Sequence, residues 1–202
     1  MSDYIIALKQ EIKYMATRTK DYQITTIYLG GGTPSYIDSR FIVEILNFIK
    51  ERYNLNENAE ITVEINPGTV NLEKIKDYKN VGINRVSIGL QSTENELLKS
   101  IGRIHTYEQF LDTYEIVRNQ GIENINVDLM IALPNQTIQQ IKTSLEKIVS
   151  LNSNHISVYS LILEEGTKLY TMAENKQISL PDEELERNMY WYVKNTLERN
   201  RI

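Results

Sequence analysis

The sequence predicts an α/β fold built around a parallel β-sheet, and two observations support this. From residue 25 onward, short runs rich in β-branched and aromatic residues alternate with longer segments whose apolar residues recur at helical spacing. Each run and the helical segment after it take about 30 residues, the size of a βαβ unit. Connections of this kind join parallel strands by right-handed crossovers, so the pattern predicts a doubly wound sheet or a barrel, complete or partial.

Five segments are predicted to be strands because each is a short apolar run bounded by turn-forming residues. They are TTIYLGG (25–31), EITVEIN (60–66), RVSIGLQ (85–91), NINVDLMIAL (124–133) and HISVYSLIL (155–163). In barrels and doubly wound sheets alike, ligands bind at the carboxyl ends of the strands. The residues that close these runs are therefore the first candidates for a functional site.

Helices are predicted between the strands and at both ends of the chain, from apolar stripes at helical spacing. The stripes are Ile5, Leu8, Ile12 and Met15; Phe41, Ile42, Ile45, Leu46 and Ile49; Phe110, Leu111, Tyr114 and Val117; and Ile138, Ile141, Leu145 and Ile148. Ser2 and Asp3 are good N-cap residues for the first helix, and Pro181 with its acidic neighbours favours a helix start near the end.

The first predicted element is thus a helix, although a βα fold normally begins with a strand. We expect Met1 to follow a missing first strand. The pattern leaves open a second interpretation, in which this helix packs as an N-terminal cap.

Composition narrows the class of protein. The 202 residues are enough for one sizeable core, so we expect a single domain over residues 1–202. A net charge of −5 argues against a nucleic acid or an anionic membrane surface as the main partner. The sequence has no Cys, which excludes disulfides, a thiolate nucleophile and a Cys-ligated metal site within these residues. No apolar stretch is long enough to span a bilayer and no signal peptide is evident, so a cytoplasmic protein is expected.

Three consecutive glycines, Gly30 to Gly32, close the first predicted strand and are followed by Thr33 and Pro34. Glycines let a ligand approach the main chain, and a proline stiffens the exit of the loop. The Walker and Rossmann phosphate loops do not fit, because no Lys or further Gly follows at the required spacing. A plain tight turn is the remaining alternative, although it needs fewer glycines.

Polar side chains stand at the ends of the other strands. Glu64 could accept hydrogen bonds from a ligand's amine or hydroxyls, or could simply face solvent. Gln91 closes its strand, and Asp128 lies in an apolar strand, where a carboxylate is costly to bury unless it is paired or binds a ligand. A structural ion pair between Asp128 and Arg103 is the main alternative for both residues.

Neither the histidines nor the tyrosines add to this set. His105 and His155 make no metal set, and His155 is interpreted as structural. Most of the thirteen tyrosines are interpreted as core or surface residues.

These observations predict a polar site at one end of a parallel sheet, made of Gly32, Thr33, Glu64, Gln91, Arg103 and Asp128. The set contains no obvious nucleophile. Its hydrogen-bonding groups suit a polar, zwitterionic or ribose-bearing ligand.

Six motifs, in chain order, resemble one known family. They are YLGGGTPS, VEINPGT, VSIGLQS, LLKSIGRIHT, VDLMIALPNQT and YSLILEEGT. They are similar to those of the radical S-adenosylmethionine (SAM) family that contains oxygen-independent coproporphyrinogen III oxidase and its heme-chaperone relatives. The resemblance runs from the first helix to the end of the chain. It implies a TIM-like, partial (β/α)6 barrel.

The resemblance also implies that the site binds SAM. The three-glycine loop, with Gly31, Gly32 and Thr33, matches the segment that approaches the amino and carboxylate end of the cofactor. Glu64 matches an acid that binds the cofactor. The other matching positions are Gln91, Arg103 and Asp128, around the ribose and methionine, and Ile162, near the adenine. The cofactor supplies the reactivity, so no catalytic acid or base is expected among these residues.

The sequence departs from the family at its start. The family carries a C-x3-C-x2-C loop whose thiolates hold a [4Fe–4S] cluster, and this sequence has no Cys. The first helix matches the family helix just after that loop, and the chain stops short of the family's C-terminal region. We therefore expect residues 1–202 to be an incomplete radical SAM core domain that has no metal ligands of its own and is inactive without its iron–sulfur segment.

In the intact family the cluster and SAM start oxidoreductase chemistry on porphyrin precursors, or heme is bound and delivered. The phrases VDLMIALPNQT and YSLILEEGT favour the heme-chaperone branch, which implies porphyrin or heme and heme-receiving proteins as partners. Two alternatives stay open. One is a cluster-free βα barrel that acts as a heme- or protein-binding module. The other is an unrelated TIM-type enzyme, for which a late Gly-rich phosphate loop would be expected.

Overall fold

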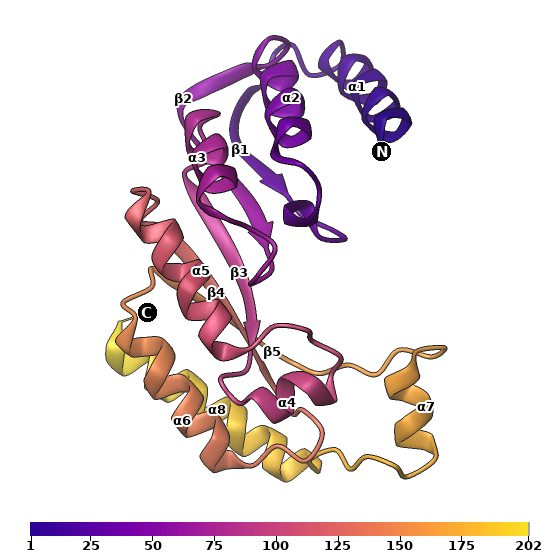
Figure 1. The fold of residues 1–202 in the computed structure, drawn as a ribbon, viewed down its shortest axis with the longest axis vertical. Coiled ribbons are helices and arrows are strands. Elements are labelled where there is room, and N and C mark those ends of the chain that lie inside the picture. Colours follow the sequence, from indigo (N-terminus) through magenta and orange to yellow (C-terminus); the bar gives the residue numbers. More distant parts are fainter. Residues whose placement is uncertain (202) are drawn as a thin grey trace. The chain divides into compact units, whose positions relative to one another are not determined.

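The computed structural model describes residues 1–201, which form an α/β fold (Figure 1). The strands are β1 (Gln23–Leu29), β2 (Asn54–Ile65), β3 (Arg85–Gln91), β4 (Asn124–Ile131) and β5 (His155–Ser160). The longer helices are α1 (Ser2–Ala16), α2 (Ser39–Lys50), α5 (Tyr107–Asn119), α6 (Ile138–Ser150) and α8 (Glu183–Asn200). The shorter ones are the 3-10 helix η1 (Pro34–Tyr36), α3 (Leu72–Asn80), α4 (Asn95–Ser100) and α7 (Lys168–Glu174).

The sheet has the strand order β1-β2-β3-β4-β5, the same as the order in the chain. The pairs β1/β2 and β4/β5 are parallel. A doubly wound sheet would reverse its strand order at a switch point, whereas a barrel adds each strand beside the last. The order therefore confirms the predicted α/β fold and selects the barrel type over the doubly wound sheet.

The described chain divides into two compact units. Unit 1 comprises residues 1–87 and 113–124, and unit 2 comprises residues 88–112 and 125–202. In unit 1, α1 packs on α2 and α2 on α3. Leu46, Val63, Ile75 and Ile83 are fully buried there. The apolar stripe predicted for α2 thus faces a core.

In unit 2, the helix α6 packs against α8. Its fully buried apolar residues include Leu90, Leu129, Ile141, Leu145 and Met189. Over residues 124–129 of β4, the fully buried Ile125, Val127 and Leu129 alternate with polar residues. Parallel strands are usually apolar on both faces, so this alternation marks one face of β4 as polar.

Some element boundaries differ from the prediction. The strand β2 begins at Asn54 rather than at residue 60, because Asn54 and Leu55 pair with Gln23 and Ile24 of β1 before a bulge. The strand β4 ends at Ile131, where Ala132 takes a left-handed φ of 59° that stops the ladder. Helices α3, α4 and α7, of nine residues or fewer, were not predicted individually.

None of the helices within residues 1–201 combines the length and apolar character that a membrane-spanning segment requires.

Candidate functional site

The three glycines after β1 differ in their surroundings and in their backbone conformation. A Cβ on Gly30 would lie 2.7 Å from Cε1 of Tyr28 and 2.9 Å from Oε1 of Glu64, closer than side chains allow. Gly31 has φ +110°, which L residues rarely adopt. A Cβ on Gly32 would meet nothing within 4 Å. A Cβ on Gly31 would likewise meet nothing, so both Gly31 and Gly32 present main chain to open space, as ligand-facing residues would.

Glu64 lies one residue before the end of β2 and faces the glycine loop. Its Oε2 accepts a hydrogen bond from the Gly31 amide at 3.2 Å, and its Oε1 accepts one from the Tyr28 hydroxyl at 2.8 Å. The structure thus brings Gly31 and Glu64 together, as the sequence predicted. Tyr28 belongs to the same group, although sequence reasoning had not singled it out.

Thr33 links the glycine loop to the segment after β2. Its hydroxyl donates to the Gly32 carbonyl at 2.6 Å and accepts from the Asn66 side-chain amide at 3.3 Å. A small pocket of about 30 Å³ lies here, lined by Gly32, Thr33, Pro34, Glu64, Ile65 and Asn66. Its lining combines a carboxylate, a hydroxyl and open main chain, which suits a small charged or polar group.

A closed ring of hydrogen bonds holds the two loops together beneath this pocket. The Thr69 hydroxyl donates to the Asn66 carbonyl, and the Asn66 amide donates to the Ser35 hydroxyl oxygen. The single hydroxyl proton of Thr69 is already used in its bond to the Asn66 carbonyl. Ser35 is therefore the donor in the 2.6 Å bond between the two hydroxyls. Ser35 is fully buried. The ring therefore fixes the exit of the glycine loop to the exit of β2.

A lysine of α3 also joins the glycine loop to the segment after β2. The Lys74 ammonium donates to the carbonyls of Ser35 and Thr69 at 2.7 and 3.2 Å. Desolvation by burial lowers the pKa of Lys74, and the nearby Asp38 carboxylate opposes that shift. Lys74 thus acts as a cross-link between the two loops.

Beside the loop lies an apolar cavity of about 470 Å³ within unit 1. Its lining comes from α1, the end of β1, the glycine loop and α2: Met1, Tyr4, Ile5, Leu8, Tyr28, Leu29, Gly30, Gly32, Thr33, Pro34, Ile37, Phe41, Ile42 and Ile45. No charged side chain lines it. Gly32 and Thr33 line both this cavity and the small polar pocket.

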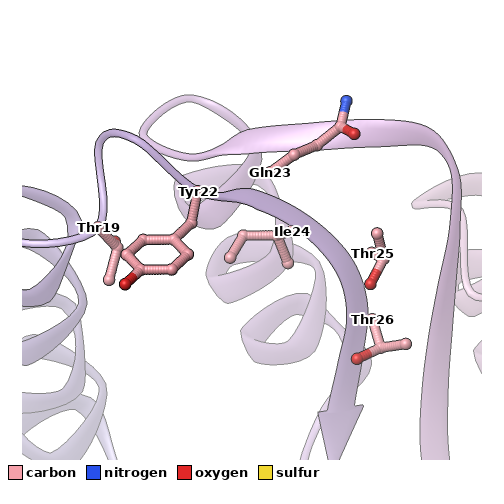
Figure 2. Close-up of a pocket in the computed structure, with 6 residues that line it drawn as sticks. All are labelled: Thr19, Tyr22, Gln23, Ile24, Thr25 and Thr26. Carbon is pink, nitrogen blue, oxygen red and sulfur yellow. The ribbon is translucent and has the colours of Figure 1, made fainter.

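A different pocket of about 360 Å³ lies at the amino end of β1, where Tyr22 and Ile24 point to the same side of the strand (Figure 2). The other lining residues are Thr19, Gln23, Thr25 and Thr26. It carries no carboxylate or cation and stands at the opposite end of β1 from the glycine loop. Since α/β folds bind ligands at the carboxyl ends of their strands, we assign no function to it.

In unit 2, Gln91 closes β3 in a strained conformation. It has a left-handed φ of 71° and only 2% of its surface is exposed. Its Oε1 accepts a hydrogen bond from the Tyr159 hydroxyl at 2.9 Å. The side-chain nitrogen has no hydrogen-bond partner among residues 1–201 and remains a donor. Strained residues at strand ends are typical of ligand sites.

Asp128 lies on β4 with an amide partner beside it. The Asn126 side chain donates to Oδ1 of Asp128 at 2.7 Å and accepts from His155 and from the Ser157 hydroxyl. The register pairs Asn126 with His155 and Asp128 with Ser157, so all four side chains share one face of the β4/β5 pair. This face is the polar face of β4.

The connection after α4 carries Arg103. The Arg103 amide donates to the Leu98 carbonyl, and His105 bonds the Leu90 carbonyl at 3.2 Å. Burial lowers the pKa of His105, and the adjacent Arg103 charge acts in the same direction, while the bond to Leu90 opposes it. His105 is therefore a neutral anchor under the end of β3.

Two isoleucines near these strand ends are exposed. Ile162 follows β5 and is 79% exposed, and Ile104, between Arg103 and His105, is 94% exposed. Ile162 was predicted to lie near a ligand's aromatic base, whereas Ile104 was not singled out.

The predicted site residues fall into two groups. Gly31, Gly32, Thr33 and Glu64 lie together in unit 1, and Gln91, Arg103, Asp128 and Ile162 belong to unit 2. Sequence reasoning missed Tyr28, Ser35, Asn126 and Tyr159. Tyr28 pairs with Thr62, two residues from Glu64, and Tyr159 lies two residues from Ser157. This register depends on strand pairing, so no signal in the sequence singles out the two tyrosines.

The order of the strands and the polar residues at their ends agree with the family to which the sequence belongs. A family model of the Radical SAM superfamily matches residues 2–148, and the chain belongs to that superfamily.

The relatives narrow this further. The chain is 40% identical over 178 residues to the heme chaperone HemW of Lactococcus lactis, covering 88% of this chain and 47% of the relative. It is 35% identical over 203 residues to HemW of Bacillus subtilis, covering 100% of this chain and 54% of that protein. The chain thus spans about half the length of the curated relatives it matches.

A solved structure has a similar fold. Coproporphyrinogen III oxidase (HemN) from Escherichia coli, a radical SAM enzyme, superposes with a TM-score of 0.85 at 25% sequence identity. The match covers 98% of this chain and 46% of the oxidase chain. Together with the strand order, it confirms the predicted TIM-like α/β fold.

Proposed function

We propose that this chain is the core of a radical SAM protein of heme or porphyrin metabolism, on the heme-chaperone branch. Support comes from its membership of the superfamily, from relatives that are heme chaperones, and from its structural similarity to a coproporphyrinogen oxidase. Porphyrin or heme is the proposed partner, with heme-receiving proteins downstream of it.

The proposal includes SAM as the ligand of the strand-end residues. The observation that carries it is the Glu64 carboxylate beside the open main chain of Gly32. A carboxylate can accept from the ammonium group of an amino acid, and exposed glycine main chain can pair with its carboxylate. The donors and acceptors of this loop therefore fit the methionine end of SAM.

The predicted residues of unit 2 have, taken by themselves, groups that suit a ribose or an aromatic base. The Gln91 amide nitrogen is a donor, and the Asp128 carboxylate can accept from ribose hydroxyls. Ile162 offers an exposed apolar side chain to the adenine. Arg103 completes the proposed set. In the superfamily, SAM would supply the radical chemistry only beside a reduced cluster, and these residues would bind and orient it.

An iron–sulfur cluster does not fit the residues present. The 202-residue sequence has no Cys, and residues 1–201 contain no group of three or more His, Asp or Glu that could hold a metal ion. We expect that this chain, after anaerobic reconstitution with iron and sulfide, shows no cluster absorbance in the visible spectrum. A stable cluster spectrum would contradict this expectation.

Binding of SAM can be tested directly by calorimetry or NMR titration of this chain. We expect weak binding, because in the family the cluster also holds the methionine end. Replacing Glu64 with Ala should abolish that binding. The control is Glu57→Ala, which removes an exposed carboxylate from the same strand β2. Equal binding by the wild type and the Glu64 variant would contradict the proposed site.

A second candidate function is a cluster-free module that binds heme or a partner protein. The absence of Cys from these 202 residues favours it. A heme titration distinguishes the two. A saturable shift of the Soret band at one equivalent, without any SAM binding, would support the module over the SAM-binding core.

A further inference from the structure

Tyr28 contacts Glu64 but is not among the residues that the sequence predicted for the site. Its hydroxyl donates to Oε1 of Glu64 at 2.8 Å, while the Gly31 amide donates to Oε2 at 3.2 Å. Each carboxylate oxygen thus accepts one hydrogen bond from the chain itself. Each oxygen has a further lone pair, so the carboxylate can still accept from a ligand.

Gly30 makes this arrangement possible. A Cβ at Gly30 would come within 2.7 Å of the Tyr28 ring and 2.9 Å of Oε1 of Glu64. The ring and the carboxylate therefore both pack against bare main chain. The first glycine of the loop serves the Tyr28–Glu64 pair rather than a ligand.

The hydrogen bond of Tyr28 is not buried in a core. Tyr28 is 57% exposed, and it also lines the apolar cavity beside the glycine loop. An exposed hydrogen bond contributes little to the free energy of unfolding, because water replaces either partner. What the bond does fix is the orientation of a carboxylate whose side chain has three rotatable torsions.

We propose that Tyr28 is a positioning residue that orients Glu64 toward the ammonium group of an amino-acid ligand. This inference rests on the proposed function for the identity of the ligand. Removing the hydroxyl frees the Glu64 side chain, so the carboxylate must be ordered when the ligand binds. The nucleoside part of the ligand carries no ammonium group, so its binding should not depend on this orientation of Glu64.

The test uses the ¹⁵N-labelled 202-residue chain, as wild type and as Tyr28→Phe. Each is titrated by NMR with SAM and with 5′-methylthioadenosine, which lacks the amino acid. We expect the Kd for SAM to rise about three- to tenfold, because binding must then also order the Glu64 side chain. The Kd for methylthioadenosine should stay within about twofold, the scatter expected away from the altered contact. The matched control is Tyr36→Phe, since the Tyr36 hydroxyl has no partner among residues 1–201 and its side chain is 80% exposed.

A second measurement needs no ligand. Exchange of the Gly31 amide proton with water should be faster in Tyr28→Phe, because Oε2 of Glu64 is then less often in place to accept it. Exchange in Tyr36→Phe should match the wild type.

The outcomes separate this inference from the proposed function. Unchanged SAM affinity in Tyr28→Phe overturns the inference, as does equal weakening of both ligands, which would indicate a structural role. If the wild type binds neither ligand, the proposed function fails, and Gly31 exchange alone decides on Tyr28. Faster exchange then supports the positioning role, and unchanged exchange overturns it.

Discussion

The glycine loop of unit 1 and the strand ends of unit 2 hold their polar groups in place in different ways. In the loop, main-chain groups and short hydroxyls set the geometry, through Gly31, Ser35 and Asn66. In unit 2, side chains on strands do so, as Tyr159 holds Gln91 and Asn126 holds Asp128. Substitutions in the loop should therefore act mainly through the backbone conformation. Substitutions on the strands should act mainly through lost side-chain hydrogen bonds.

The largest contrast is expected within the glycine loop. Gly31→Ala forces a Cβ onto a residue with φ +110°, and should reduce the free energy of unfolding by about 1–3 kcal/mol. Gly32→Ala adds a Cβ that meets nothing, and should change stability by less than about 0.5 kcal/mol. Urea denaturation of the two variants measures the difference. Equal losses would show that the loop is not limited by the backbone of Gly31.

The next effect concerns pairing of side chains on the strands. Tyr159→Phe leaves Oε1 of the buried Gln91 without its donor, and should cost about 1 kcal/mol. Tyr28→Phe removes a bond on an exposed side chain and should cost less than about 0.5 kcal/mol. Chemical denaturation of both variants tests this comparison. A larger loss in Tyr28→Phe would mean that the loop, not the strand end, depends on its tyrosine for stability.

The smallest effect is a dependence on pH in unit 2. The pKa of His105 is lowered in the folded chain from the ordinary 6.5, so the unfolded chain binds its proton first as the pH falls. Stability should be full above pH 6.5 and should fall as the pH drops from there toward the folded pKa. His105→Gln should lose this part of the dependence while its amide can still donate to the Leu90 carbonyl. Denaturation curves above and below pH 6.5 compare the two proteins.

Much of the fold could be predicted from the sequence, because the strands and long helices carry strong periodic patterns. The strand β3 was predicted with its observed bounds, since RVSIGLQ is a single apolar run between turns. The short helix α3 was not, because its nine residues have a low mean hydropathy and only Ile75 and Tyr78 are buried. The periodic pattern alone left open the choice between a barrel and a doubly wound sheet. The family resemblance predicted the barrel, and the strand order confirms it.

The candidate site was predictable where a residue type is unusual for its position. Three glycines at a strand end and a carboxylate in an apolar strand are such cases. Tyr28 and Tyr159 were missed because tyrosine is ordinary on a strand, and only the partner of its hydroxyl distinguishes it. Ser35 was missed for the same reason, since its role depends on Thr69 and Asn66, more than thirty residues away.

The ring formed by Ser35, Thr69 and Asn66 has a spectroscopic consequence. The main-chain N–H of Asn66 can only donate and its carbonyl can only accept. The donor and acceptor roles of the Ser35 and Thr69 hydroxyls are therefore fixed. Ser35 is fully buried, which shields its proton from water. We expect this proton to exchange with water slowly enough to give a separate resonance in proton NMR spectra. The exit of the glycine loop thus carries its own reporter, which would record any ligand that opens the ring.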